Sequence, residues 1–221
     1  MSSPENTLLA DSIRLSFGSF DVLNGAWLRS ETGKVTGVLG RNGCGKSCMF
    51  RTIMGGLISQ GLYVRVNDKI VTGSMEMGKY IKYMAQKHFL PPKMTLGEVF
   101  EYFGADYEAF TDDFPKFAQY PKTRVKELSG GEIRIAEIWL CLCSDSPFCI
   151  LDEPFSYLAP VAIETVQKLI RKYREKKGII ISDHNYEALL EVSDEVLLLS
   201  DGYVHLVKDR SDLVRYGYCM I

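Results

Sequence analysis

The stretch from Gly40 to Ser47 restricts the fold of this chain more than any other part of the sequence. It reads Gly-Arg-Asn-Gly-Cys-Gly-Lys-Ser and fits the pattern G-x-x-x-x-G-K-[ST]. It follows the apolar run Val35–Leu39, which predicts a strand, and precedes residues that favour a helix. Glycines at these spacings let successive N–H groups face a chain of phosphates, and the next helix adds its positive end. The stretch therefore predicts a phosphate-binding loop; the alternative is a glycine-rich turn that binds nothing.

The side chains of this loop have separate expected roles. Lys46 is expected to reach the outer phosphates of a nucleotide, and the Ser47 hydroxyl offers the hard oxygen ligand that Mg²⁺ prefers. Cys44 is interpreted as a small residue that fits a tight loop, with a thiol pKa lowered by the helix end as the alternative. The residues expected to surround the phosphates are Gly40, Arg41, Asn42, Gly43, Cys44, Gly45, Lys46, Ser47 and Cys48.

The rest of the chain predicts an α/β fold in one domain, residues 1–221. In the second half, helix and strand patterns alternate, which is typical of a parallel sheet. A further pair of apolar runs flanks the turn Asp201-Gly202 and predicts a closing hairpin. Strands are expected at residues 12–17, 35–39, 61–66, 148–151, 178–182, 196–199 and 203–207, and helices at about 131–143 and 161–176.

A small helical subdomain, about residues 87–133, is predicted as an insert in this core. Thr95 and Glu98 have the spacing of a capping box, and an aromatic-rich helix follows them. The aromatic residues of this region have two possible roles, as the core of the insert or as a groove for a partner. They are Phe89, Phe100, Tyr102 and Phe103.

Composition limits the classes of partner. Lysine and arginine number 26 against 28 aspartates and glutamates, a net charge of −2, so no broad basic surface and no nucleic-acid partner is expected. No apolar run approaches the roughly 20 residues that span a bilayer. The first twelve residues lack the basic start and apolar block of a secretory signal. We therefore expect contact with a membrane only through another protein.

Further motifs follow the phosphate-binding loop in a fixed order. Asp152 ends the apolar run from Phe148, so its carboxylate is expected at the edge of the sheet where α/β proteins bind ligands. Its neighbour Glu153 is a candidate general base. The segment Leu128-Ser-Gly-Gly-Glu132 contains a capping box, which by itself predicts only a helix start. His184 follows a predicted buried strand, a place where histidine is often structural.

Taken together, these motifs resemble the ATP-binding-cassette (ABC) family over nearly the whole chain. The segment Tyr83-Met-Ala-Gln86 stands where that family has its Q-loop, and residues 128–132 stand where it has its signature segment. The resemblance implies a P-loop NTPase (RecA-like) core with an antiparallel β subdomain and a small helical subdomain. It also implies ATP and Mg²⁺ as ligands.

The resemblance assigns a role to each of these positions. Phe17 would stack on adenine, where the alternative is a core residue. Glu153, His184 and Gln86 would be the catalytic residues, with Ser47, Gln86 and Asp152 around Mg²⁺. For Gln86 the alternative is an ordinary polar loop residue. In the family, the signature segment of one subunit completes the ATP site of another, which assigns Ser129, Gly130 and Gly131 to the nucleotide of a second copy.

The implied function is that of an ATP-hydrolysing subunit that dimerises around ATP and drives a separate transmembrane permease from the cytoplasmic face of the membrane. The second subunit is either another copy or a related chain. The alternatives are a soluble cassette ATPase acting on ribosomes or DNA, and a regulatory ATP-binding scaffold. One departure bears on the mechanism: the family segment Ser-Ala-Leu-Asp is here Ser156-Tyr-Leu-Ala159. In the family that aspartate helps to link the two active sites across the dimer, so Ala159 bears directly on their coupling.

Overall fold

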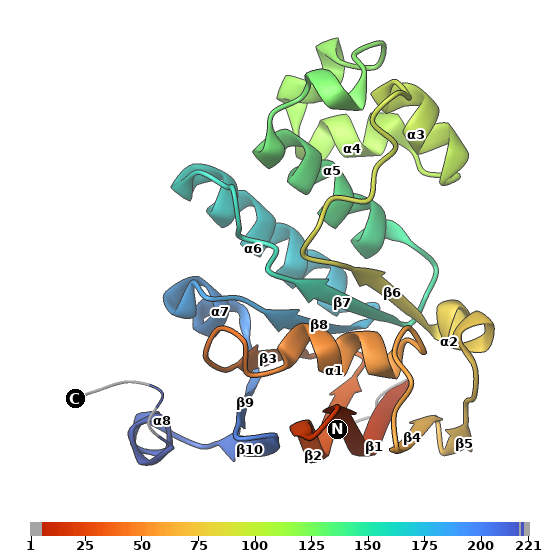
Figure 1. The fold of residues 1–221 in the computed structure, drawn as a ribbon. Helices are drawn as coiled ribbons and strands as arrows, with labels where there is room; N and C mark the ends of the chain where they lie inside the picture. The colour runs from red at the N-terminus through yellow and green to blue at the C-terminus, as the bar shows by residue number, and fades with distance from the viewer. Residues whose placement is uncertain (1–5, 217, 219–221) are drawn as a thin grey trace.

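The computed structural model describes residues 6–216 and 218 and contains two sheets (Figure 1). The larger sheet has six strands in the order β10-β9-β3-β8-β7-β6, of which only the β9–β10 pair is antiparallel. Its strands are β3 (Val35–Leu39), β6 (Ile81–Met84), β7 (Phe148–Asp152), β8 (Gly178–Ser182), β9 (Glu195–Ser200) and β10 (Tyr203–Val207). Every residue of β3, β7 and β8 is buried, as expected for central strands covered on both faces.

The smaller sheet is antiparallel, with the order β2-β1-β4-β5. Its strands are β1 (Thr7–Phe17), β2 (Phe20–Glu31), β4 (Gly61–Val66) and β5 (Lys69–Ile70). Buried and exposed residues alternate along β1 and β2, so one face of this sheet packs inward. The sequence analysis did not identify β2, and it placed the start of β1 five residues too late.

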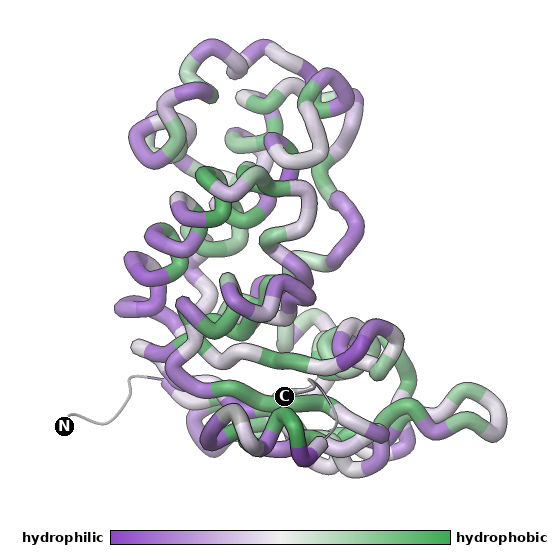
Figure 2. The backbone as a smooth tube through the Cα atoms, turned by 90° about the vertical axis from the view of Figure 1, so that its left-hand side faces the viewer, coloured by the Kyte–Doolittle hydropathy of each residue, from purple (hydrophilic) through white to green (hydrophobic). Residues whose placement is uncertain are grey.

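The two faces of the larger sheet belong to different cores. Helix α1 (Lys46–Ile53) and the antiparallel sheet cover one face, with Phe50 and Met49 packed against Val38 and Ile150. The other face is covered by α5 (Gly130–Cys143), α6 (Pro160–Arg174) and α7 (Tyr186–Val192). Figure 2 shows hydrophobic segments of the chain in the interior of the molecule. Two short helices, α2 (Ser74–Tyr80) and α8 (Arg210–Arg215), lie at the periphery.

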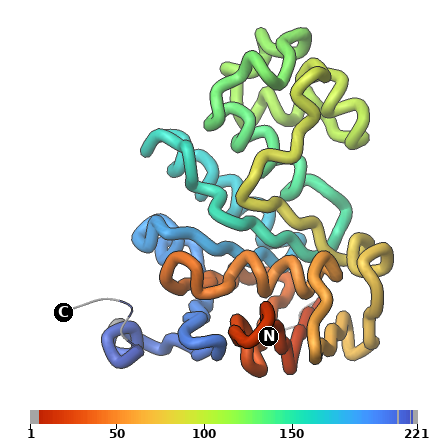
Figure 3. The backbone as a smooth tube through the Cα atoms, in the orientation of Figure 1, coloured from red at the N-terminus to blue at the C-terminus, as the bar shows by residue number. Residues whose placement is uncertain are grey.

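A helical region stands at the end of the molecule away from the antiparallel sheet. Figure 3 shows the chain leaving the sheet after β6, forming this region and returning through α5. It contains α3 (Leu96–Tyr102), α4 (Tyr107–Asp113) and the 3₁₀ turns η1 (Pro115–Gln119) and η2 (Val125–Glu127). Thr95 and Glu98 form the predicted capping box at the start of α3. The limits of this region as a subdomain stay a prediction.

The aromatic residues of this region differ in burial. Phe100 is buried and packs against Phe110 and Trp139, with ring centroids 4.7 and 5.6 Å away. Phe89, Tyr102 and Phe103 are exposed to 37, 74 and 46%. Phe100 is therefore a core residue and the other three are surface residues. Among the described residues, no helix has the length and apolar character needed to cross a bilayer.

Candidate nucleotide-binding site

The predicted phosphate-binding loop joins β3 to α1, as the sequence pattern indicated. Gly45 stands at the N-terminus of α1 with a φ of 110°, in the region that favours glycine. A Cβ at Gly45 would lie 2.8 Å from Val22 Cγ1, so the packing of β2 also requires glycine here. The first turn of α1 contains no acidic side chain. Its N–H groups and positive helix end are therefore available to an anion.

The Lys46 side chain folds back across this loop. Its Nζ donates to the carbonyl oxygens of Gly40 and Arg41, at 2.6 and 3.3 Å, and the residue is 8% exposed. A buried ammonium needs hydrogen-bond acceptors, and here the loop backbone supplies them. Phosphate oxygens are stronger, charged acceptors at the same position. Lys46 is thus held over the loop, and its predicted contact with the outer phosphates stays a prediction.

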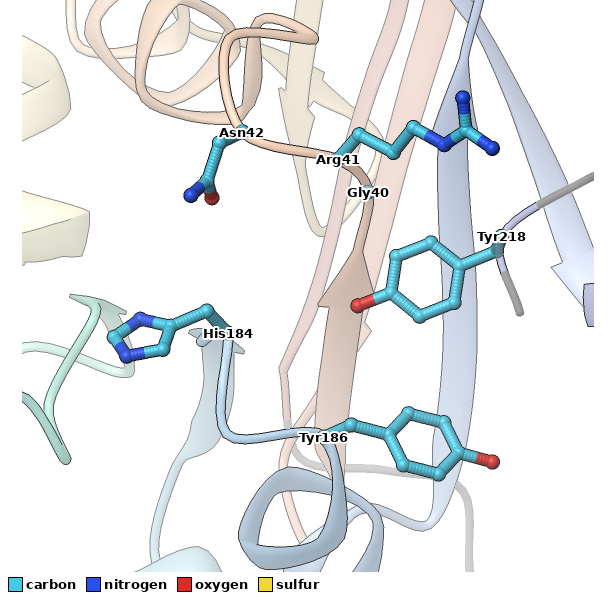
Figure 4. A pocket seen from close by; sticks show the side chains of 6 residues that line it. All are labelled: Gly40, Arg41, Asn42, His184, Tyr186 and Tyr218. Atoms are coloured by element: carbon cyan, nitrogen blue, oxygen red, sulfur yellow. The ribbon is translucent and has the colours of Figure 1, made fainter. Parts of the chain in front are cut away.

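A hollow of about 440 Å³ lies beside the loop (Figure 4). Gly40, Arg41 and Asn42 line one side of it. The remaining lining residues are His184, Tyr186 and Tyr218, and the Tyr218 hydroxyl points into the space between the loop and His184. Sequence reasoning predicted the loop and His184 but missed both tyrosines. These are separated from the loop by more than 140 positions and belong to no motif.

Asp152 ends β7 at the sheet edge, next to the loop that follows β3. It is 1% exposed and accepts hydrogen bonds from Ser182 Oγ at 2.6 Å and from the Tyr83 hydroxyl at 3.1 Å. Burial, together with the Asp152 charge, raises the pKa of Tyr83. Both oxygens of the carboxylate are therefore fixed by neutral donors from the two strands beside β7. Neither donor was identified from the sequence.

Glu153 adopts a left-handed backbone conformation, with a φ of 55°. Its N–H donates to the Ser182 carbonyl oxygen at 2.7 Å, which helps to hold a conformation that costs roughly 1 kcal/mol or more. The structure brings the three predicted catalytic residues together. Gln86 Nε2 donates to Glu153 Oε2 at 2.9 Å, and His184 Nδ1 lies 3.7 Å from the same oxygen. Ser156 Oγ also donates to it, at 3.2 Å.

Asp183 joins the loop after β7 to the loop after β8. Its buried carboxylate accepts the N–H of Phe155 at 2.9 Å and the N–H of Asn185 at 2.8 Å. Burial raises the pKa of Asp183, and these two backbone donors oppose that rise. Asp183 therefore fixes the segment that contains Glu153 relative to the segment that contains His184. Asp183 was not among the site residues predicted from the sequence.

The signature segment begins α5 and lies beside a second hollow, of about 420 Å³. Ser129 and Glu132 form the predicted capping box, with Ser129 Oγ 2.8 Å from Glu132 Oε2. A Cβ on Gly131 would lie 2.8 Å from the Tyr157 carbonyl oxygen, so only glycine fits this close approach. Lys116 also lines the hollow, with its Nζ 3.6 Å from Glu132 Oε1. Among the described residues, none lines both hollows. Residues of the phosphate-binding loop line the first hollow, and residues of the signature segment line the second.

Two further positions stand apart from these groups. Phe17 is 54% exposed at the end of β1, so it is a surface residue and not a core residue. Ala159 is the N-terminal capping residue of α6 and makes no side-chain cap. Where Asp would cap this helix, Ala leaves its first N–H groups without that partner, at a cost of about 1 kcal/mol.

The residues proposed for Mg²⁺ fit it by their chemistry. Ser47, Gln86 and Asp152 offer hydroxyl, amide and carboxylate oxygens, the hard ligands that Mg²⁺ takes beside phosphates and water. Asp152 is buried with both oxygens in hydrogen bonds, which suits a role through a water molecule. The described residues contain no cluster of three or more His, Cys, Asp and Glu residues that alone would hold a metal.

Cys44 is packed inside the loop. A Cβ on Gly40 would lie 2.5 Å from its Sγ, so the thiol fills space that only glycine leaves open. Burial raises the pKa of Cys44, and the nearby Lys46 charge opposes this only in part. The alternative of a lowered pKa is therefore wrong, and Cys44 is a small packing residue.

Alkylation of Cys44 is expected to block ATP binding, because any added group would enter the loop. Since only the thiolate reacts, the rate at neutral pH should be slow and should rise about tenfold per pH unit below the raised pKa. Saturating ATP should protect the residue. Mass spectrometry of the labelled peptide and titration with ATP measure both effects, with Cys44→Ala as the control for the other thiols. Unchanged ATP affinity after complete labelling of Cys44 would refute the assignment.

Comparison with known proteins decides the family. The family model described as ABC transporter matches residues 23–156, which include the phosphate-binding loop, the signature segment and Glu153. The chain belongs to the ABC transporter family. The predicted resemblance is confirmed, and so are ATP binding and ATP hydrolysis as its activity, because the ATP-binding subunits of ABC transporters are ATPases.

Similar proteins in this family carry names of the same kind. The chain is 27% identical to an uncharacterized ABC transporter ATP-binding protein of Rhizobium meliloti, over 95% of this chain and 83% of that protein. It is 27% identical to the lipopolysaccharide export system ATP-binding protein LptB of Haemophilus influenzae, over 89% of this chain and 88% of LptB. The energy-coupling factor transporter ATP-binding protein EcfA2 of Mesoplasma florum is 28% identical, over 84% of this chain and 65% of EcfA2.

Solved structures confirm the predicted fold class. An ATP-binding subunit of an ABC transporter superposes with a TM-score of 0.81 at 20% identity, covering 96% of this chain and 93% of that chain. A bacterial Atm1-family ABC exporter with ATP bound superposes with a TM-score of 0.82 at 19% identity. That match covers 97% of this chain and 40% of the exporter chain. The P-loop core with an antiparallel β subdomain is therefore the fold of this ABC subunit.

Proposed function

We propose that this ABC subunit binds ATP between two chains, each of which supplies half of the site. The observation that carries the proposal is the separation of the two hollows. The loop containing Lys46 and the N-terminus of α5 each present backbone N–H groups suited to phosphate, but they line separate hollows that share no residue. A head-to-tail pair of chains would bring each loop opposite the signature segment of its partner. Either a second copy or a related ABC subunit fits this arrangement.

The contacts of Glu153 support its role as the general base. It lies at the sheet edge beside the loop, and Gln86, Ser156 and His184 surround one of its carboxylate oxygens. A carboxylate so held can accept a proton from a water molecule and orient it for in-line attack on the outer phosphate. His184 is 59% exposed toward the hollow, where it can contact the same phosphate. Gln86 would orient the water and Glu153 together.

Mg²⁺ would be held by Ser47, Gln86 and, through water, Asp152. When bound, it would neutralise part of the phosphate charge. The contribution of this chain is to fix those oxygens. Ser182 and Tyr83 hold the Asp152 carboxylate, and the start of α1 holds Ser47.

A transmembrane permease is the partner that the proposal assigns to a groove of about 930 Å³. The groove lies between the edge strand β6, the end of α5 and the turn after α3, and it is lined by aromatic residues that include Phe89, Phe103, Trp139 and Tyr173. The lining also contains charged residues, Lys79, Lys82, Asp106 and Asp145. A groove that combines apolar and charged side chains suits a short amphipathic helix. With a permease there, the subunit would act at the cytoplasmic face of the membrane.

ATP-dependent association tests this proposal. The Glu153→Gln variant should hold ATP without hydrolysing it, so Mg·ATP should convert the purified chain from monomer to dimer in sedimentation experiments. The same variant, added to detergent-solubilised membranes, should retain a multi-span membrane protein. A Phe103→Asp variant should lose that protein and still dimerise with ATP, and Tyr102→Asp, outside the groove, serves as its control. A chain that stays monomeric at saturating Mg·ATP, with and without the membrane fraction, would contradict the proposal.

A further inference from the structure

The middle of α5 contains an ion pair that is completely buried. The side chains of Arg134 and Glu137 are both 0% exposed, and Arg134 Nη1 lies 3.3 Å from Glu137 Oε2. A buried ion pair contributes little to the stability of a fold, because the cost of removing both charges from water offsets much of their attraction. Arg134 Nε moreover has no hydrogen-bond partner among the described residues. A buried pair with an unsatisfied donor calls for an explanation other than stability.

Four further hydrogen bonds of the pair go to the backbone of one loop, residues 85–90, which follows β6 and contains Gln86. Arg134 Nη1 donates to the Ala85 carbonyl oxygen at 3.0 Å, and Nη2 donates to the Gln86 carbonyl oxygen. Glu137 Oε1 accepts the N–H of Phe89 at 2.6 Å and that of Leu90 at 3.4 Å. The arginine thus holds the beginning of the loop by its carbonyl groups, and the glutamate holds its end by its N–H groups.

His88 adds a third attachment between these two. Its Nδ1 lies 2.9 Å from Glu137 Oε2, and its ring centroid lies 5.7 Å from that of Tyr157. Leu90 at the end of the loop is buried in the core, but residues 86–89 are exposed, so packing does little to fix the part of the loop near Gln86. A main chain without a regular hydrogen-bond ladder moves unless side chains or water satisfy it. In this chain the α5 pair supplies that restraint.

We infer that Arg134 and Glu137 are positioning residues that fix residues 85–90 so that the Gln86 amide stays on Glu153. The inference rests on the proposed roles of Gln86 and Glu153. Because the Gln86–Glu153 hydrogen bond is 2.9 Å long, a shift of the loop by about 1 Å would break it, and such a displacement reduces a catalytic rate by up to about 100-fold. Within one chain, the proposed phosphate contacts come from the loop before α1, and among the described residues none of the pair's hydrogen bonds reaches that loop. The effect should therefore fall on kcat.

The same hydrogen bonds also link residues 85–90 to the signature segment through α5. The signature residue Ser129 begins α5, and Arg134 lies within the next two turns of that helix. A movement of α5 would therefore carry residues 85–90 with it. Phe89 is fixed to Glu137 by its N–H while its ring lines the 930 Å³ groove. The pair connects the groove, the signature helix and Gln86 through direct contacts.

Steady-state kinetics of the full chain test the inference. Glu137→Gln keeps the size of the side chain and removes its charge, and the double variant Arg134→Met with Glu137→Leu replaces the pair by apolar side chains, which buried pairs tolerate. In both, kcat should fall about 10- to 100-fold while the dissociation constant for ATP stays within about twofold of the parent value. Hydrogen exchange of residues 85–90 should become faster. Ile138→Ala, a cavity in the same helix that leaves the loop contacts intact, should change neither kcat nor that exchange.

A kinetic cycle with Gln86→Ala separates this inference from the proposed function. If the pair acts through Gln86, the double variant should cause no further fall in kcat when Gln86 is already alanine. Unchanged kcat in the double variant, or losses that multiply with that of Gln86→Ala, would overturn the positioning role and leave the proposed mechanism intact. If Gln86→Ala alone has normal kcat, the proposed role of Gln86 and the inference are both wrong.

Discussion

Glu153→Gln is expected to lower the rate of ATP hydrolysis by about 10²- to 10⁴-fold, the usual contribution of a general base. The amide has nearly the same shape as the carboxylate but cannot accept a proton from water. Its oxygen can still accept the hydrogen bonds of Gln86 and Ser156, which the carboxylate accepts at 2.9 and 3.2 Å. The N–H of residue 153 would keep its bond to Ser182. ATP affinity should thus be nearly unchanged, and phosphate-release and equilibrium-binding assays measure the two quantities.

The matched control for this variant is Glu164→Gln. Glu164 is an exposed residue of α6, and among the described residues no hydrogen bond or ion pair joins it to the site, so its substitution should leave the rate within about twofold of the parent. Hydrolysis at the parent rate in Glu153→Gln would exclude this residue as the base. Loss of ATP binding together with activity would instead indicate damage to the fold of the site.

The parts of the site that the sequence predicted are those carried by adjacent residues. The loop from Gly40 to Ser47 contains its own glycine spacing, its strand and its helix, so a short window is sufficient to predict its shape. The same holds for the capping box of Ser129 and Glu132, which forms as predicted. Asp152 was placed at the sheet edge because the end of an apolar strand is readable from the chain alone.

The parts that were missed depend on segments distant in the sequence. Strand β2 carries Asn24-Gly25 in its centre and pairs with β1 through register shifts, so its alternation is interrupted. Arg134 and Glu137 have the spacing of an ordinary pair on an exposed helix. Nothing in α5 itself shows that the loop around Gln86, nearly 50 residues earlier, covers them. Burial of charge is a tertiary property, and a helical pattern does not reveal it.

Complementation between two inactive variants is expected to restore ATP hydrolysis, because each proposed composite site would use one chain for the loop and the other for the signature segment. Lys46→Ala removes the cation that lies over the loop. Ser129→Asp keeps a good N-cap for α5 but places a carboxylate against the phosphates bound by the partner. Each variant alone should lose about 100-fold or more in rate, as is common when one phosphate-stabilising group is removed.

In an equimolar mixture, half of the randomly formed dimers contain one chain of each kind, and each of these has one intact site. The mixture should therefore recover about a quarter of the parent rate if the sites hydrolyse independently. Ala159 bears on this value, since the aspartate that links the two sites in the family is absent and independent sites are the simpler expectation. Ser129→Thr retains both the cap and the hydroxyl. It should therefore be active by itself, and its activity should not require a second variant in the mixture. A mixture as inactive as its components would show that two copies of this chain do not build the site together, and would point to a related chain as the second subunit.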